Sequence, residues 1–142
     1  MQVENILQSK GRAVHTLPTG ASIAEAVEML NTRRIGAIVV TTADGKVAGI
    51  LSERDVVRHL GKDWASLANR PVSDVMTKDV VTMSRRATVA EVMERMTERR
   101  IRHLPIVDNG ELVGIVSIGD VVKRKIEETE QEAIALKEYI AS

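Results

Sequence analysis

The chain repeats itself once, and this constrains its fold more than any other feature of the sequence. Residues 14–59 align with residues 80–124 when the sequence is compared with itself. The agreement begins near Ser22 and Thr88 and ends in a Gly-x-x-Ser-x-x-Asp motif in each copy. The period is longer than those of solenoid repeats, and there are only two copies. The repeat therefore predicts two fused subdomains rather than an array.

Both copies carry the same predicted order of elements, β-α-β-β-α. Short extended segments at 13–17 and 80–83 precede a helix that Ser22 or Thr88 can cap, with a glutamate three residues later. Two short apolar runs follow around Asp44-Gly45 or Asn109-Gly110, which are strong hairpin signals. A further helix begins at Ser52 or Ser117. The predicted fold class is α/β (α+β), with two such subdomains in a pseudo-twofold arrangement whose sheet faces pack together.

We divide the chain into residues 1–60, the first repeat with its N-terminal segment; 61–79, a linker; 80–125, the second repeat; and 126–142, a C-terminal helix extension. An apolar seam with alternating spacings of four and three runs into the last segment, as in a coiled coil: Val122, Ile126, Thr129, Ala133, Leu136 and Ile140. This seam either packs on its own domain or binds a partner helix. We favour a symmetric partner, because little of the chain remains to cover it.

Charge and composition disfavour several functional classes. The 142 residues include 20 Lys+Arg and 20 Asp+Glu, so any anion site must be local, and we expect no nucleic-acid or membrane partner. With no Phe, one Trp and one Tyr, the chain lacks stacking platforms for nucleic acid. The absence of Cys fits a reducing cytoplasm, where we expect the protein. We also expect no metal site, membrane span or signal peptide, since neither histidine spacing nor apolar runs support them.

The Gly-x-x-Ser-x-x-Asp motif is the main candidate binding element. It spans Gly49 to Asp55 in the first copy and Gly114 to Asp120 in the second. A Ser-x-x-Asp before an apolar run is close to a capping box, which by itself explains most single occurrences. Its repetition with the glycine favours a ligand. Glycine permits close approach, serine and helix amides suit phosphate, and a carboxylate accepts both hydroxyls of a ribose.

A basic cluster at 99–105 is the second clue. Arg99 and Arg100 end a helix, where cations suit the helix dipole without any ligand. Arg102 and His103 lie beyond that helix and could bind an anion in the second site. The first copy has Gly36 and Ala37 there, so its site must take positive charge elsewhere, and Arg54 is the nearest candidate. We therefore expect two non-equivalent clefts.

The duplicated unit resembles a tandem pair of cystathionine-β-synthase-type (CBS) domains, a module that also forms small stand-alone bacterial proteins. The similarity covers nearly the whole chain and rests on residues 49–55, 74–77, 102–108 and 114–120. The resemblance implies two clefts that bind adenosyl ligands such as AMP, ADP, ATP, NAD or S-adenosylmethionine. It also implies that the pairs dimerise into a disc.

Together with the charged residues above, the resemblance gives two candidate sites. The first comprises Val14, Thr16, Gly49, Ser52, Arg54 and Asp55. The second comprises Val80, Thr82, Arg102, His103, Pro105, Gly114, Ser117 and Asp120. By the resemblance, the aspartates hold the ribose, the serines approach the phosphate, and the first-strand residues border the base.

The leading hypothesis is a non-catalytic regulatory sensor that binds an adenine nucleotide, AMP first, and shifts the populations of two dimer arrangements. No catalytic residue, catalytic cofactor or metal is expected. One alternative is a structural dimerisation or adaptor module in which the Ser-x-x-Asp motifs only cap helices. An enzyme is a weaker alternative, because the sequence has neither a P-loop nor a nucleophile elbow with an evident histidine base.

Overall fold

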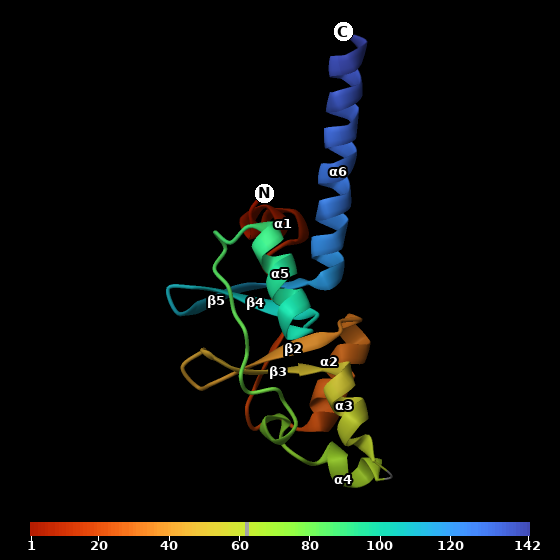
Figure 1. Cartoon of the computed structure of the whole chain (residues 1–142). Coiled ribbons are helices and arrows are strands. Elements are labelled where there is room, and N and C mark those ends of the chain that lie inside the picture. Colours follow the sequence, from red (N-terminus) through yellow and green to blue (C-terminus); the bar gives the residue numbers. More distant parts are fainter. Residues whose placement is uncertain (62) are drawn as a thin grey trace.

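The computed structural model describes residues 1–61 and 63–142, and it contains two small sheets stacked one above the other (Figure 1). The first repeat supplies β1 Thr16–Pro18, α2 Ile23–Arg33, β2 Ala37–Thr41, β3 Val47–Ser52 and α3 Glu53–Leu60. The second repeat supplies α5 Val89–Arg99, β4 His103–Asp108, β5 Glu111–Ser117 and α6 Ile118–Ala141. The flanking segments form α1 Val3–Lys10, α4 Trp64–Ala68 and the 3-10 turn η1 Val72–Asp74. The mixed α/β class and the pair of repeated units are as predicted.

Local capping fixes where the repeated helices begin and end. Thr88 accepts a hydrogen bond from the backbone N–H of Glu91 (3.0 Å), whose carboxylate accepts one from the Thr88 N–H (3.1 Å). Ser22 accepts the matching bond from Glu25 (3.1 Å). Each helix ends at an arginine in the left-handed region, Arg34 with φ 53° or Arg100 with φ 54°. The two repeats therefore turn out of their first helices in the same way.

The second repeat lacks the strand predicted at 80–83, and Pro105 gives the reason. In the first repeat β1 pairs in parallel with β2, and the Val39 N–H donates to His15 O (3.3 Å). Pro105 aligns with Val39 but has no N–H, so it cannot donate the equivalent bond. Only an isolated bridge between Met83 and Ile106 remains. The predicted extended segment is thus reduced to its last residue.

Two separate cores form, and the N-terminal segment crosses from the first repeat to the second. Val3, Ile6 and Leu7 of α1 pack into the core of the second repeat. Three residues of the connecting segment, Leu67, Val72 and Val75, pack into the core of the first repeat. The packing therefore places the N-terminal segment, which the range 1–60 groups with the first repeat, on the second.

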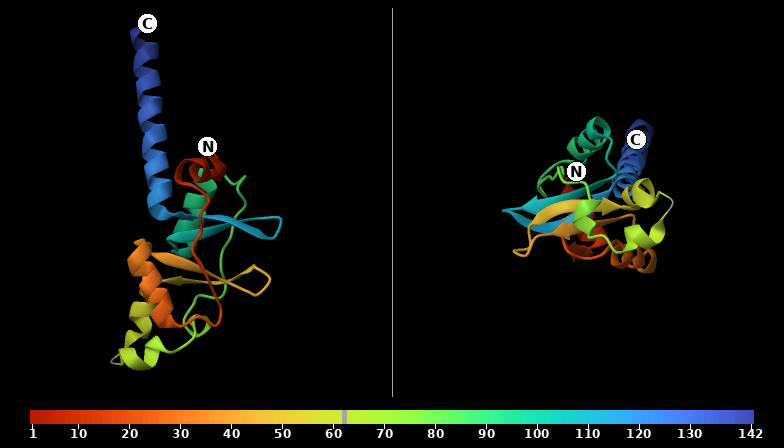
Figure 2. Two further views of the ribbon diagram at one scale, coloured as in Figure 1. Left: turned by 180° about the vertical axis from the view of Figure 1, so that it is seen from behind. Right: turned by 90° about the horizontal axis from the view of Figure 1, so that it is seen from below.

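The sheets meet through the face of each hairpin that does not carry helices. Ile38 and Val40 of β2 belong to the first core, yet Ala37 and Val39 on the opposite face are also buried. Figure 1 and the left view of Figure 2 both show the second hairpin lying over this face. The two hairpins run side by side, and their turns reach the same side of the molecule.

α6 continues unbroken through the predicted boundary at 125–126 and projects well beyond the sheets (Figure 2). Val121 in its first turn is buried, whereas residues 129–142 are all exposed. Among the described residues, no helix is both long and apolar enough to cross a membrane.

Candidate functional site

A cavity of about 230 Å³ lies where the two repeats meet, and it collects the strongest candidates from both. The end of β3 and the start of α3 contribute Ile50, Ser52, Glu53, Arg54, Asp55 and Arg58. The segment between α5 and β4 contributes Arg100, Ile101, Arg102 and His103, and Gly36 and Thr77 complete the lining. The fold therefore places Arg102 and His103 beside Ser52 and Asp55, although the sequence assigned them to the second site.

Ser52 and Asp55 form a capping box at the start of α3. The Asp55 N–H donates to Ser52 Oγ (3.3 Å), and Asp55 Oδ2 accepts from the Ser52 N–H (2.8 Å) and hydroxyl (3.0 Å). Asp55 is only 7% exposed. Among the described residues, every hydrogen bond to this carboxylate falls on Oδ2. Oδ1 thus keeps its lone pairs, so helix capping and binding of a ligand hydroxyl are compatible.

The cavity is locally basic in a chain with no net charge. Four arginines line it, Arg54, Arg58, Arg100 and Arg102, against the carboxylates of Glu53 and Asp55. Within residues 1–61 and 63–142, none of these arginines is in an ion pair. They leave a local charge of about +2 when histidine is neutral. Such a surface favours an anion.

His103 lines the cavity from the second repeat and lies next to Gly36 of the first. Burial lowers the pKa of His103 below its ordinary value and so favours the neutral ring, while the carboxylate of Glu53 opposes that shift. A Cβ added to Gly36 would come within 3.1 Å of His103 Nε2. The histidine of the second repeat therefore needs the glycine of the first.

The second motif has different surroundings. Ser117 and Asp120 form the same capping box, but Lys10 of α1 donates to Asp120 Oδ2 (2.7 Å) and to Ile115 O (3.0 Å). Burial raises the pKa of Asp120, but the hydrogen bonds from Lys10 and Ser117 and the charge of Lys10 outweigh it, so the pKa lies below its ordinary value. In the first repeat, Thr77 instead pairs its backbone with Ile50. The carboxylate of Asp120 is therefore already paired with the Lys10 ammonium group.

The two motif glycines allow close approach of other parts of the chain, whereas the sequence predicted close approach of a ligand. A Cβ on Gly49 would collide with Met76 and would lie 2.8 Å from Thr77 O. A Cβ on Gly114 would lie 2.6 Å from the Leu7 side chain of α1. Both glycines are therefore needed for the packing of the flanking segments.

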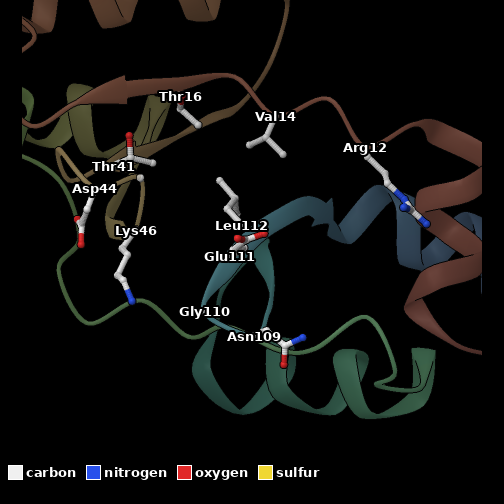
Figure 3. A pocket seen from close by; sticks show the side chains of 11 residues that line it. Arg12, Val14, Thr16, Thr41, Asp44, Lys46, Asn109, Gly110, Glu111 and Leu112 are labelled. Atoms are coloured by element: carbon white, nitrogen blue, oxygen red, sulfur yellow. The ribbon is translucent and has the colours of Figure 1, made fainter.

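The other predicted residues lie away from this cavity. Val14 and Thr16 line a larger, more open cavity of about 680 Å³ between the two hairpin turns, near Lys46 and Asn109 (Figure 3). In the second group, Pro105 is buried in β4, Val80 is half-buried and Thr82 is exposed. The first candidate site is thus divided between two cavities.

Sequence reasoning missed several lining residues. Arg58 lies four residues after Arg54 on α3, and that spacing could have found it, because such residues share a helix face. Arg100 was attributed to the helix dipole alone, but its left-handed conformation ends α5 and places it at the cavity. Gly36 and Thr77 carry no signal of this kind.

Comparison with known proteins agrees with this architecture. The CBS domain family model matches residues 6–62 and 72–127. The mitochondrial CBS domain-containing protein CBSX3 of Arabidopsis thaliana is 31% identical over 97% of this chain and 71% of its own length. The crystal structure of the CBS-domain containing protein ATU1752 from Agrobacterium tumefaciens is 46% identical, with a TM-score of 0.83 over 88% of this chain and 99% of that one.

Two other similar structures hold adenosyl ligands. The CBS domain protein PAE2072 from Pyrobaculum aerophilum, complexed with AMP, is 29% identical, with a TM-score of 0.74 over 84% of this chain and 89% of that one. The CBS domain pair of protein MJ0100, in complex with 5′-methylthioadenosine and S-adenosyl-L-methionine, is 25% identical, with a TM-score of 0.79 over 90% and 98%. With both repeats matched by the family model and paired as in these structures, the chain belongs to the CBS domain family as a tandem CBS pair.

Proposed function

We propose that this chain is a regulatory module that binds an adenine nucleotide, AMP first, in the cavity between Ser52 and His103. One observation carries the proposal: the cavity joins the Ser52–Asp55 cap of the first repeat to arginines from both repeats. The AMP bound to PAE2072 and the adenosyl ligands bound to MJ0100 support the ligand class.

Each part of a nucleotide has a matching group. The start of α3 and the four arginines suit the phosphate, because helix amides and forked guanidinium donors both bind oxyanions. Asp55 Oδ1 suits the ribose diol. Ile50 and Ile101 supply apolar surface for the base. At about 230 Å³ the cavity is smaller than the ~300 Å³ at which ligand pockets usually begin, so part of the nucleotide would extend past its rim.

Charge orders the candidate ligands. An arginine-lined cavity favours AMP, ADP, ATP and NAD, which all carry phosphate, over S-adenosylmethionine, which carries a positive sulfonium centre. Among the phosphate-bearing ligands, AMP requires the least room outside the cavity. AMP is therefore the first ligand to test.

Binding would regulate rather than catalyse. We propose that the chain forms a homodimer and that the nucleotide shifts the populations of two dimer arrangements without making or breaking a bond. The transmitted free energy is then limited to the difference between the ligand's affinities for the two arrangements. Turnover of ATP with magnesium above background would contradict this part of the proposal.

Isothermal titration calorimetry with AMP, ADP, ATP, NAD and S-adenosylmethionine tests the site. We expect Asp55→Asn and Arg102→Gln each to weaken AMP binding by about tenfold or more, since each removes a charged partner. Asp120→Asn and Arg95→Gln, in the other motif and on the exposed face of α5, are the matched controls and should bind like the parent. Circular dichroism verifies that each variant is folded.

The capping boxes favour one alternative, the adaptor module. They show that Ser52 and Asp55 have a structural role without any ligand. If no nucleotide gives binding heat to the folded parent, or if Asp120→Asn loses binding while Asp55→Asn keeps it, the proposed site is wrong. A dimer that persists without any ligand would then support the adaptor.

A further inference from the structure

The projecting half of α6 presents an apolar stripe that the other described residues leave exposed. The larger residues of the predicted seam are all exposed: Val122 is 44%, Ile126 54%, Leu136 59% and Ile140 72% exposed. The seam has Thr129 and Ala133 between them, and both are exposed. The seam extends about 27 Å along one continuous helix.

α6 packs on its own domain through a different face. Val121 is buried, Arg124 donates to Asn5 O (3.1 Å), and Glu128 lies 4.0 Å from the N-terminal amine. At about 100° per residue, this face points roughly 120° away from the seam. A second helix could therefore lie along the seam without meeting the domain that carries the first.

The charges beside the seam identify that second helix as another copy of α6. With Ile126, Ala133 and Ile140 at heptad position a, the charged residues at the flanking e and g positions are Lys123, Lys125, Glu130, Glu132 and Lys137. In a parallel, in-register pair each g residue faces the residue five positions later on the other helix. Lys125 then faces the partner's Glu130, and Glu132 faces the partner's Lys137. Twofold symmetry doubles both contacts, so all four are attractive.

The antiparallel arrangement brings like charges together. Matching Ile126 with the partner's Leu136 aligns the two seams, and e positions then face e while g positions face g. Glu130 and Glu132 would each lie near their own copies, and Lys123 would lie near the partner's Lys137. Within the chain, Lys125 has only a loose contact with Glu128 (4.0 Å), so it remains able to reach across.

We propose that α6 forms a parallel, in-register, two-stranded coiled coil with α6 of a second copy of this chain. The interface is distinct from the disc contact that the family resemblance implies, because most of it lies on the part of α6 beyond the CBS pair. The twofold axis runs along the seam, with the two CBS pairs on opposite sides of it at the same end of the coil. The extended helix thereby joins two complete nucleotide sensors.

Two charge variants of the full-length chain test the proposal. Glu130→Lys/Glu132→Lys makes all four flanking contacts of its homodimer repulsive pairs of lysines. Lys125→Glu/Lys137→Glu makes the same four contacts repulsive pairs of glutamates. We expect each variant alone to have a dimer dissociation constant about 100-fold weaker than the parent by sedimentation equilibrium. Mixing the two restores all four attractive contacts, so a heterodimer of near-parent affinity should form. The proposal would be overturned if both variants formed homodimers as tight as the parent's and showed no preference for mixing. It would also be overturned if the parent were as monomeric as the two variants at the same concentration.

Two further measurements test the seam and its direction. Leu136→Asp should weaken the dimer, whereas Ile134→Asp, at an equally exposed residue outside the seam, should not. Because the chain has no cysteine, Ser142→Cys provides a single spin-label site. Labels close together support the parallel pair, and a separation of roughly 33 Å indicates the antiparallel one and overturns it. AMP titration of the same variants should match the parent, so failure of the coil and failure of the nucleotide site are distinguishable.

Discussion

At the scale of single residues, a few differences make two similar repeats into two different environments. His103 of the second repeat occupies the space left by Gly36 of the first. Lys10 sits on Asp120, whereas the equivalent edge in the first repeat is paired with the backbone of Thr77. The sequence predicts two non-equivalent clefts from Arg102 and His103, and the contacts of Lys10 and Thr77 add a difference that it did not predict.

The half-buried position of His103 predicts a pH dependence of stability. Its folded-state pKa lies below the ordinary 6.5, chiefly because of burial. The unfolded chain therefore binds more protons between the two values, so the free energy of unfolding falls as pH drops from about 6.5 towards the folded pKa and then levels off. Urea unfolding from pH 5 to 8 should show this loss, and His103→Gln should reduce it.

NMR titration of the His103 ring supplies the control for that prediction. Glu53 raises the pKa of His103, so Glu53→Gln should lower the pKa further. A pKa that rises in Glu53→Gln, or a stability profile unchanged by His103→Gln, would contradict the assignment.

The ion pair between Lys10 and Asp120 leads to a prediction about how many nucleotides each chain binds. Because the Lys10 ammonium group occupies the Asp120 carboxylate, the parent should bind AMP only at the Ser52–Asp55 cavity. Lys10→Ala exposes the second motif, and calorimetry should then show an additional binding event per chain. Ser9→Ala, at the neighbouring exposed residue, is the control. If Lys10→Ala keeps the parent stoichiometry, the second motif is only a helix cap.

At the scale of elements, hydrogen-bond chemistry explains which strands form. Both hairpins appear where Asp44-Gly45 and Asn109-Gly110 predicted them, and both Ser-x-x-Asp helices begin at their serine caps. The strand before the second hairpin fails although its residues are as apolar as those of the first. The apolar pattern that predicted this strand depends on side chains, whereas the strand fails because Pro105 lacks a backbone N–H.

Pro105→Val should restore that strand. The new amide can donate to Val81 O, as the Val39 N–H donates to His15 O in the first repeat. We expect the amide at position 105 to exchange slowly with solvent in hydrogen-exchange NMR. The reverse change, Val39→Pro, should destabilise the protein by about 1–3 kcal/mol because it removes a buried donor. Rapid exchange at position 105 would count against this explanation.

At the scale of the whole molecule, the N-terminal segment couples the two repeats. Leu7 of α1 and Leu67 of α4 each complete the core of one repeat, and both are almost fully buried. We expect calorimetry to show one unfolding transition, and Leu7→Ala and Leu67→Ala each to lower its stability by about 2–4 kcal/mol. Two separated transitions, with each variant shifting only one, would show that the repeats unfold independently.

The sequence predicted the repeated units, most of their elements and, among the charged residues of the cavity, Arg54, Asp55 and Arg102, because these leave local patterns. It did not predict which copy's residues meet. Arg102 and His103 follow a helix of the second repeat but face the start of α3, and nothing in their spacing shows which cleft they enter. The sequence likewise does not show which core α1 joins, because its apolar residues are compatible with either one.

The destination of α1 has a consequence for how the protein is made. α1 leaves the ribosome before either repeat, yet the strand and helix that cover Val3, Ile6 and Leu7 are synthesised only after the whole first repeat. At ordinary translation rates this delay is on the order of 10 s. For that interval the nascent chain exposes the apolar residues of α1 to solvent, whereas the first repeat already has every segment that its core requires.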